Sequence, residues 1–385
     1  MKYRGIAITG PSGVGKTAVA RMLCEKYNHF QIVQAVTTRE QRRDDYAGQY
    51  KYVSEKRFVS LEESDKLLVK AEHKGHMYGI TRDSFDSVIE NGKIPVMVVT
   101  PESAKGITNE GFISVFLSAP NEILDKRLEN RGESISETTM KQREKDLRYE
   151  KNCLYSLKNM EIEKTFELLQ YLWEYRSSGG ILPGRIIRLM IDCGVLLDGV
   201  DNLENIQGAS YDLSLGDEYY SGGKIKKLTD EEPFIIIEPY DYAIVTGKEN
   251  ANFPRDISGR FDLSVKLFCQ GVILSNGPQV DPGFRGKLFC LLFNTSNALV
   301  VLKRGQHYAT LEFHKLLEPT TSYKGKYQNK LKIINYLPSN TLQGAVSELR
   351  KELEKVKTES RNLQTIVLGT IGALLTIVAL LLALR

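Results

Sequence analysis

The sequence lacks the cysteine patterns that stabilise secreted proteins or bind zinc. Its 385 residues include five cysteines, none of them in a C-x-x-C pair. This argues against a disulfide framework and a cysteine-based zinc site, and it predicts a reducing compartment. The chain also lacks an excess of one charge, since 52 basic and 48 acidic side chains leave a net charge of +4. A nucleic-acid partner is therefore not expected.

Long apolar runs are also scarce. The first, residues 5–9, is too short for a signal peptide, and none is expected. Residues 365–384 form an uncharged run of twenty, long enough at about 1.5 Å per residue to cross a hydrocarbon core of about 30 Å. We therefore expect a single-pass membrane tail anchor, with the rest of the chain in the cytoplasm. A buried core helix is the alternative.

Before this run, apolar residues recur at alternating steps of four and three. With charged residues between them, this spacing predicts a coiled coil over residues 340–364 and then a transmembrane helix over residues 365–384. An amphipathic helix packed on the body is the alternative, because the repeat is only about three heptads long. The heptad positions are Leu342, Val346, Leu349, Leu353, Val356, Ser360, Leu363 and Val367.

The clearest functional motif lies near the N-terminus. Residues 10–17 read Gly-Pro-Ser-Gly-Val-Gly-Lys-Thr, a complete G-x-x-x-x-G-K-[ST] phosphate loop. It follows a short strand pattern at residues 5–9 and precedes a helical pattern, as such a loop requires. The lysine of this motif binds the β- and γ-phosphates and Thr17 would ligate Mg²⁺, so ATP and Mg²⁺ are the expected cofactors. The expected ATP contacts are Gly10, Ser12, Gly13, Val14, Gly15, Lys16 and Thr17.

Composition divides the chain into two bodies. In residues 1–176, strand patterns alternate with helical ones, which predicts an α/β domain. Residues 177–184 are rich in Gly, Ser and Pro and are expected to form a linker. Short β-rich runs follow one another in residues 185–335 and predict a mainly antiparallel β domain. The β-rich runs are residues 234–237, 242–245, 271–274, 288–293 and 299–302.

The first body resembles a guanylate kinase over residues 4–175. Besides the phosphate loop, the matching motifs are T-T-R-x-x-R…G-x-Y at residues 37–50, the Tyr78-Gly79 turn, and R-L-x-x-R-G at residues 127–132. The resemblance implies a nucleoside monophosphate kinase-like phosphotransferase, in which several arginines neutralise the transferring phosphoryl group. The residues implied for the acceptor phosphate are Arg39, Arg42, Tyr50 and Tyr78. Those implied for ATP and transfer are Lys16, Thr17, Arg127, Arg131 and Arg143, and the catalytic set would be Lys16, Arg39, Arg131 and Arg143.

The base pocket departs from the guanylate kinase pattern. Ala35, Val69 and Ile80 stand where the family usually has a serine, a glutamate and a second hydroxyl. Val98 and Thr100 replace an acidic pair. A pocket without these polar groups does not pair with guanine, so GMP is not the expected acceptor. Another nucleoside monophosphate fits, and so does a sugar phosphate, because ribose-bisphosphate kinases resemble guanylate kinases with similarly depleted base pockets. A domain that only binds nucleotide is the remaining alternative.

The second body resembles the dCTP deaminase and dUTPase family over about residues 185–317. The resemblance rests on residues 207–216 (QGASYDLSLG) and 280–286 (VDPGFRG). It implies a distorted β-barrel that forms homotrimers, with pyrimidine-nucleotide sites between subunits and a chemistry without zinc. The chain accordingly has no H-x-E motif with paired cysteines. The second nucleotide pocket would contain Ser264, Lys266 and Asp281.

Deamination is not expected from this second body. The glutamate general base of the family lies in the strand after the D-P-G-x-x-G turn, where this chain has Leu291. A leucine cannot transfer protons. The glycine-rich C-terminal phosphate motif of dUTPases is missing too. We therefore expect the trimer and a nucleotide pocket without the deaminase reaction.

These expectations combine into a membrane-tethered homotrimer that binds nucleotides, in which three barrels bring three coiled-coil helices together. The first hypothesis is ATP-dependent phosphorylation of a nucleoside monophosphate at the membrane surface. The second is a nucleotide sensor that signals through its transmembrane helices, as a stress or phage-defence protein would. An active dCTP deaminase or dUTPase, or a ribose-phosphate kinase, are further alternatives.

Overall fold

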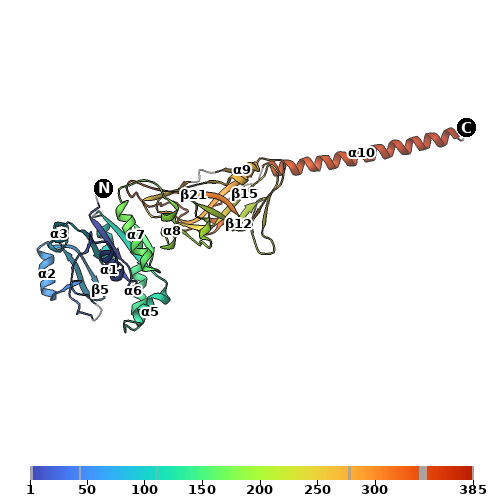
Figure 1. The fold of residues 1–385 in the computed structure, drawn as a ribbon. Coiled ribbons are helices and arrows are strands. Elements are labelled where there is room, and N and C mark those ends of the chain that lie inside the picture. The colour runs from blue at the N-terminus through green and yellow to red at the C-terminus, as the bar shows by residue number, and fades with distance from the viewer. Residues whose placement is uncertain (1–2, 43–44, 110, 276–278, 338–344, 384–385) are drawn as a thin grey trace.

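The chain folds into two bodies, and a long helix extends from the second (Figure 1). The computed structural model describes residues 3–42, 45–109, 111–275, 279–337 and 345–383. The first body is an α/β domain, the second is mainly antiparallel β, and the last element is helical. The predicted fold class is confirmed.

The first body is built on a five-stranded parallel sheet with the strand order β2-β7-β1-β8-β9. Its central strands β1 and β8 are almost entirely buried. Such continuous apolar strands are typical of a parallel sheet that is covered by helices on both faces. The strands are β1 (Gly5–Thr9), β2 (Phe30–Ile32), β7 (Ile94–Val98), β8 (Phe112–Ser118) and β9 (Tyr155–Lys158).

A second, four-stranded sheet with the order β4-β3-β6-β5 forms a small lobe at the end farthest from α10 (Figure 1). Helix α2 (Glu55–Glu63) is capped by Ser54, whose hydroxyl accepts a hydrogen bond from the Arg57 N–H. The helix buries Phe58 and Leu61 against this sheet. The strands are β3 (Ala35–Thr37), β4 (Tyr50–Tyr52), β5 (Leu67–His73) and β6 (His76–Thr81).

Helices connect and cover the main sheet. The hydroxyls of Thr81 and Ser136 cap the N-termini of α3 and α6 by accepting hydrogen bonds from first-turn N–H groups. α1 turns Val19, Ala20 and Leu23 toward the core. The helices are α1 (Lys16–Lys26), α3 (Arg82–Glu90), α4 (Ala104–Asn109), α5 (Asn121–Glu129), α6 (Glu137–Leu147) and α7 (Ile162–Glu174).

The second body is an antiparallel β domain. Its ten-stranded sheet has the central order β17-β19-β15-β12-β21-β16-β18, while β14 and β20 form a separate ribbon. Buried and half-buried side chains alternate along β19, which places one face of this strand on the core. The strands of the central order are β12 (Ser210–Ser221), β15 (Tyr242–Asn252), β16 (Ile257–Leu263), β17 (Val272–Ser275), β18 (Gln279–Val280), β19 (Arg285–Asn294) and β21 (His307–Lys315). The others are β10 (Gly180–Ile181), β11 (Leu196–Asp198), β13 (Lys224–Lys227), β14 (Phe234–Ile237) and β20 (Val300–Lys303).

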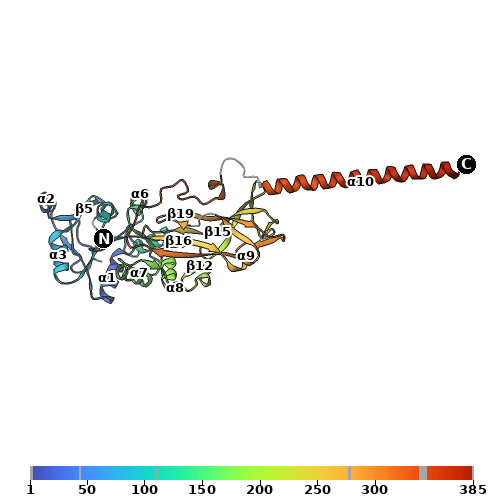
Figure 2. The same ribbon diagram turned by 90° about the horizontal axis from the view of Figure 1, so that it is seen from above.

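Residues 177–184, predicted as a linker, are tied to the second body. Strand β10 pairs with β21, and helix α8 (Gly184–Asp192) begins directly afterwards. Helices α7 and α8 lie side by side in both views (Figures 1 and 2). Their apolar residues belong to one hydrophobic core that continues from the first body into the second. The two bodies are therefore packed together.

A buried charge network also joins the two bodies. Asp256, which is 2% exposed, accepts a hydrogen bond from Lys315 Nζ at 2.9 Å and another from the hydroxyl of Tyr155 on β9. Lys315 is buried as well. Because an unpaired buried charge is costly, these partners depend on one another. The network therefore fixes the end of the parallel sheet against β16 and β21.

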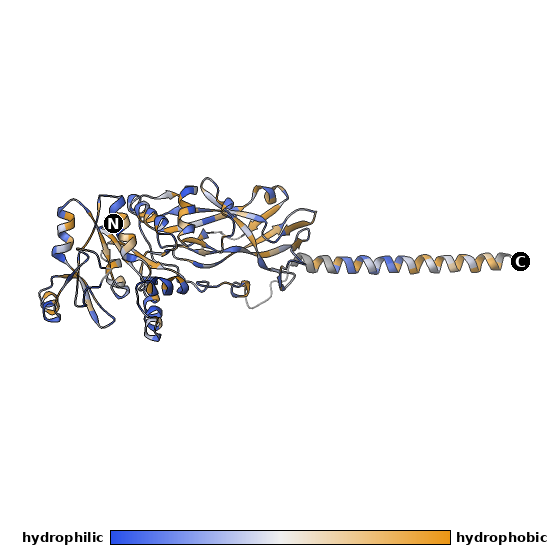
Figure 3. Cartoon of the chain, turned by 60° about the horizontal axis from the view of Figure 1, so that its bottom comes forward, coloured by the Kyte–Doolittle hydropathy of each residue, from blue (hydrophilic) through white to orange (hydrophobic). Residues whose placement is uncertain are grey.

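Helix α10 (Ala345–Ala383) leaves the second body as one continuous helix. Side chains of residues 352–381 are exposed, and hydrophobic residues predominate toward the C-terminal end (Figure 3). The segment Glu352–Leu381 is long and apolar enough to cross a membrane. Residues 340–344 of the predicted coiled coil, with Leu342, and Leu384 of the predicted span lie outside the described residues. The coiled coil stays a prediction.

Candidate functional site

The phosphate loop has a backbone geometry that can surround an anion. Gly13 and Gly15 have φ angles of 82° and 94°, in the left-handed region that favours glycine. α1 begins directly after Gly15, and a glycine has no side chain that could cap the first-turn N–H groups. A helix N-terminus with open N–H groups favours a bound anion. The loop is therefore suited to a triphosphate.

Lys16 lies at the end of this loop and folds back over it. Its ammonium donates hydrogen bonds to the carbonyl oxygens of Gly10 at 2.7 Å and Pro11 at 3.0 Å. Burial lowers the pKa of Lys16 to about 8, although the carboxylate of Asp146 acts in the opposite direction. A phosphate beside the ammonium would favour its protonated form. Phosphate binding at this loop would therefore be coupled to proton uptake at alkaline pH.

The affinity for Mg-ATP is expected to fall about tenfold between about pH 7 and about pH 9, because the free Lys16 amine must take up a proton above its pKa of about 8. Calorimetric titration of the full-length protein would measure this. Lys16→Arg is the control, since a guanidinium stays charged over this range. An equal loss of affinity in the control would contradict the role of Lys16.

Thr17 provides an oxygen suited to a magnesium ion. Its hydroxyl accepts a hydrogen bond from Gln49 Nε2 at 3.2 Å, and Gln49 is buried. This contact orients the hydroxyl and leaves a second lone pair on its oxygen. The loop N–H groups, the Lys16 ammonium and the Thr17 oxygen together have the chemistry that ATP and Mg²⁺ require.

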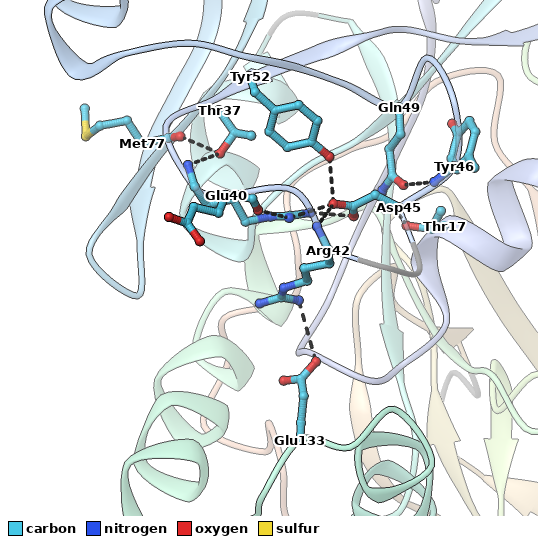
Figure 4. Close-up of polar contacts among 11 residues, drawn as sticks. Thr17, Thr37, Glu40, Arg42, Asp45, Tyr46, Gln49, Tyr52, Met77 and Glu133 are labelled. Atoms are coloured by element: carbon cyan, nitrogen blue, oxygen red, sulfur yellow. Dashed lines mark hydrogen bonds and ion pairs between the residues drawn. The ribbon is translucent and has the colours of Figure 1, made fainter.

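On the acceptor side, Arg39 binds the carboxylate of Asp45 in a bidentate pair. Its two terminal nitrogens donate to the two carboxylate oxygens at 2.6 and 2.7 Å, and both side chains are 6% exposed. The Tyr52 hydroxyl, which points at Asp45 (Figure 4), donates to the same carboxylate at 2.7 Å, and the Arg42 N–H donates at 2.8 Å. The guanidinium of Arg39 also lies over the ring of Tyr50, 4.8 Å from its centroid. The site is therefore built to hold an anion.

Asp45 occupies this anion site as a charged group. Burial raises the pKa of Asp45, but hydrogen bonds from Arg39, Tyr52 and the Arg42 N–H outweigh burial and lower the pKa to about 2. The carboxylate is therefore ionised at neutral pH. A phosphate binds a guanidinium fork in the same bidentate way as a carboxylate. An acceptor phosphate must share Arg39 with Asp45 or displace it.

One cavity of about 460 Å³ contains both sides of the site. Among the predicted ATP contacts, it is lined by Gly10, Ser12, Gly13, Lys16, Thr17 and Arg131. Among the predicted acceptor residues, it is lined by Arg39, Arg42, Tyr50 and Tyr78. The structure therefore brings most of the predicted donor and acceptor residues together.

Other predicted residues do not line this cavity within the described part of the chain; they are Val14, Gly15, Arg127 and Arg143. Arg127 donates to the carbonyl oxygens of Val14 at 3.2 Å and Asn159 at 3.1 Å, which holds it against the loop backbone. Arg143 is 7% exposed and donates to the Asp125 carboxylate at 2.7 Å. In this conformation Arg143 joins α6 to α5 and does not reach the phosphate site.

The part of the cavity expected to hold a base is apolar. Ala35, Val69 and Ile80 line it. In the small sheet Ile80 of β6 is paired with Ala35 of β3 and with Val69 of β5. Directly paired residues of neighbouring strands share one face of a sheet, so the three side chains form one wall. Val98 and Thr100 line the same cavity.

The sequence motifs did not identify several polar residues of the cavity. Asp45 and Gln49 lie inside the T-T-R…G-x-Y segment, so their position between two predicted ligands could have marked them. Glu133, which is 3.6 Å from Arg42, follows the R-L-x-x-R-G motif. His73 of β5 has no motif around it, and no sequence signal could have found it.

Of the predicted nucleotide residues of the second body, Asp281 lines a cavity that the other two do not line. Asp281 is exposed and lines a cavity of about 240 Å³ together with Phe289 and Tyr327. Ser264 is buried ahead of the short helix α9 (Val265–Cys269), and Lys266 is exposed on that helix. Of the residues that the structure describes, neither of these two lines the cavity of Asp281. A single chain therefore does not assemble the predicted pocket.

Leu291 lies in an apolar setting on β19. It is paired with Ile244 of β15 and Ser275 of β17. Its side chain packs on a cluster that contains Tyr220, Ile244 and Ile333. The position that the resemblance implies for the general base is therefore a leucine, and the titratable groups named in its cluster are the phenols of Tyr220 and Tyr242, which are not carboxylates.

Comparisons with known proteins match the two bodies separately. A family model for guanylate kinase matches residues 2–175, and one described as dCTP deaminase-like matches residues 181–316. A dCTP deaminase from Thermococcus gammatolerans is 37% identical over 131 residues, which are 34% of this chain and 82% of that protein. A guanylate kinase from Chlamydia felis is 30% identical over 174 residues, which are 43% of this chain and 85% of that protein. The chain belongs to both families.

The guanylate kinase domain contains the phosphate loop and the large cavity, and the dCTP deaminase-like domain contains Leu291 and Asp281. Among solved structures, a guanylate kinase from Anaplasma phagocytophilum aligns with 46% of this chain and 89% of its own. The alignment has 21% sequence identity and a TM-score of 0.37.

Proposed function

We propose that the guanylate kinase domain transfers the γ-phosphoryl group of ATP to a nucleoside monophosphate other than GMP. The observation that carries this proposal is a single cavity that combines Lys16 and Arg39 with the apolar wall of Ala35, Val69 and Ile80. Phosphate binding is thus provided on both sides, while the groups that would pair with guanine are replaced by hydrocarbon.

In this reaction an oxygen of the acceptor phosphate attacks the γ-phosphorus, and the bond to the β-phosphate oxygen breaks to release ADP. The Thr17 hydroxyl would hold Mg²⁺, which would supply charge neutralisation at the β- and γ-phosphates. Lys16 neutralises the same oxygens, and Arg39 and Arg42 hold the acceptor phosphate. Water competes with the acceptor for the phosphoryl group. Closure of the small lobe over the cavity would exclude it.

The same wall restricts the choice of acceptor. A base bound against Ala35, Val69 and Ile80 gains contact area but no hydrogen bond from these side chains. A polar guanine edge would lose its water there without replacement, which costs affinity. A sugar phosphate such as a ribose phosphate uses the same phosphate contacts and is the second acceptor class to test.

Restoring polar groups to the wall is expected to improve GMP as an acceptor. In the Val69→Glu, Ile80→Ser double variant, kcat/KM for GMP should rise by at least about tenfold, because one hydrogen bond to a charged group contributes about 1.5–3 kcal/mol. Coupled assays of ADP release would measure it. Val59→Glu, at a position 46% exposed on α2 of the same lobe, is the matched control and should change nothing. No gain in the double variant would refute the assigned base wall.

For the dCTP deaminase-like domain we propose a homotrimer that binds a pyrimidine nucleotide without deaminating it. Within one chain, the cavity lined by Asp281 is not lined by Ser264 or Lys266 of the described residues, as expected if a pocket is completed between subunits. Alternate residues of the β14–β20 ribbon, Phe234, Ile236 and Val301, are about half exposed and could be covered by another copy. Leu291 supports the loss of the reaction.

We further propose that α10 anchors the trimer in a membrane, with the nucleotide-binding domains in the cytoplasm, where ATP is available. The uncharged run at residues 365–384 and the exposure of the helix support this. The heptad spacing over residues 340–364 would let three helices associate ahead of the membrane.

A nucleotide sensor is the second candidate, because the shared core and the Tyr155–Asp256–Lys315 network connect the kinase domain to the body that bears α10. A stress or phage-defence protein of this kind would need nucleotide binding but no turnover. Retention of its cellular effect in a protein that binds ATP but transfers no phosphate would favour the sensor.

A further inference from the structure

A cluster of one imidazole and two carboxylates borders the transfer cavity. His73 lies at the end of β5, Glu102 in the short 3-10 turn Pro101–Ser103 after β7, and Asp146 on α6. One ligand atom from each residue lies within 4.8 Å of the others. His73 also lines the 460 Å³ cavity. The three side chains therefore join the small lobe, the main sheet and helix α6 at one point.

The cluster is largely shielded from water. Asp146 is 1% exposed, and the side chains of His73 and Glu102 are 10% and 14% exposed. Two carboxylates held this closely in a buried place repel each other unless a positive charge lies between them. Lys145 Nζ is 3.7 Å from one Glu102 oxygen, but its side chain is 54% exposed. The Lys16 ammonium also acts on Asp146 from the phosphate loop, and the His73 ring lies 3.3 Å from Glu102.

The hydrogen bonds of the cluster leave one acceptor unused. Gln142 Nε2 donates to Asp146 Oδ1 at 2.7 Å and is 3.4 Å from Glu102 Oε1. His73 Nδ1 is hydrogen-bonded to Glu102 Oε1 at 3.4 Å. Glu102 Oε2 is fully buried and accepts no hydrogen bond from any described residue, although the same nitrogen lies 3.3 Å from it. A buried carboxylate oxygen without a donor is suited to a cation.

The donor set indicates the kind of cation. Mg²⁺ and Ca²⁺ prefer oxygen ligands alone, whereas an imidazole together with carboxylates suits Zn²⁺ or Mn²⁺. Bonds of about 2.0–2.2 Å to such an ion would draw the three ligand atoms slightly closer than they are here. Gln142 would then orient Asp146 through its hydrogen bond without contacting the ion, as the hydrogen-bond partners of metal ligands usually do.

We propose that His73, Glu102 and Asp146 form a binding site for a divalent transition-metal ion, separate from the Mg²⁺ that accompanies ATP. The ion holds the small lobe and helix α6 against the main sheet, and so stabilises the arrangement in which the acceptor residues face the phosphate loop. This site needs neither ATP nor an acceptor to bind its ion.

Binding of Mn²⁺ alone to the full-length protein in detergent tests this site. Electron paramagnetic resonance and calorimetry should detect one Mn²⁺ per chain without nucleotide, and Zn²⁺ should displace it. Asp146→Asn should weaken the affinity by at least about tenfold, since even outer-shell partners of a metal are worth that much. If Asp146→Asn lowers the melting temperature, His73→Gln is the second variant, and its Mn²⁺ affinity should also be weaker than that of the wild type.

Two variants serve as controls. Asp212→Asn removes a carboxylate 3.3 Å from His307 in the second body and should leave Mn²⁺ affinity unchanged. Thr17→Ala removes the proposed ligand of the ATP-bound Mg²⁺ and should also leave it unchanged. No Mn²⁺ or Zn²⁺ binding, or equal affinity in the wild type, Asp146→Asn and His73→Gln, would overturn the proposal. Failure of phosphoryl transfer would not affect this result, because no nucleotide is present.

Discussion

Replacing Lys16 by methionine is expected to slow phosphoryl transfer by about a hundredfold to a thousandfold. The ammonium lies over the phosphate loop, bound to the carbonyl oxygens of Gly10 and Pro11, and is the loop's one side-chain cation. Methionine keeps the length of the side chain but removes the charge that stabilises the transferring phosphoryl group. Single-turnover rates with radiolabelled ATP and the best acceptor would measure the loss.

Lys26→Met is the matched control for this experiment. Lys26 is exposed at the far end of the same helix, so the same change in chemistry should leave the rate unchanged. A Lys16→Met protein as fast as the Lys26→Met protein would contradict the assignment of the phosphate loop as the donor site.

Incubation of the full-length protein with dCTP is expected to yield no dUTP above the uncatalysed rate. A general acid–base residue contributes about 10²–10⁴-fold to such proton transfers, and Leu291 cannot replace it. The cluster around Leu291 contains Ile244, Ile333 and the phenols of Tyr220 and Tyr242 but no carboxylate. Chromatographic separation of the nucleotides after prolonged incubation would measure any product.

The dCTP deaminase of Thermococcus gammatolerans, 37% identical over the matched region, is the positive control under the same conditions. Calorimetry with dCTP would show separately whether the domain still binds the nucleotide. Accumulation of dUTP with the present protein would refute the loss of deamination and point to a different catalytic group.

The local sequence pattern was sufficient to predict the strands that are short and apolar. Strands β1 and β14 coincide with the predicted residues 5–9 and 234–237, because each is a run of apolar residues bounded by turn formers. The long strand β12 was not predicted as a strand. It alternates polar and apolar residues and changes register between Leu213 and Ser214 and again between Leu215 and Tyr219. Pairing with distant strands, which no local window contains, stabilises it.

In the candidate site, too, local motifs predicted some residues, while contacts with distant residues determine others. Residues carried by a motif, such as Lys16, Arg39 and Tyr78, line one cavity as the motif implies. Arg143 does not, because Asp125 binds it, and this partner lies 18 residues away on another helix. Asp45 was not predicted as a site residue, although its carboxylate pairs with the Arg39 guanidinium. Which way these arginines point depends on acidic partners elsewhere in the fold, and a sequence motif does not contain that information.

The most direct measurement is transfer of the labelled γ-phosphoryl group from ATP by the full-length protein to a panel of monophosphates. The panel contains GMP, the other purine and pyrimidine nucleoside monophosphates, and a ribose phosphate. We expect one acceptor to exceed GMP in kcat/KM by at least about tenfold, because the base wall is apolar. A preference for GMP, or no transfer to any acceptor, would contradict the proposed function.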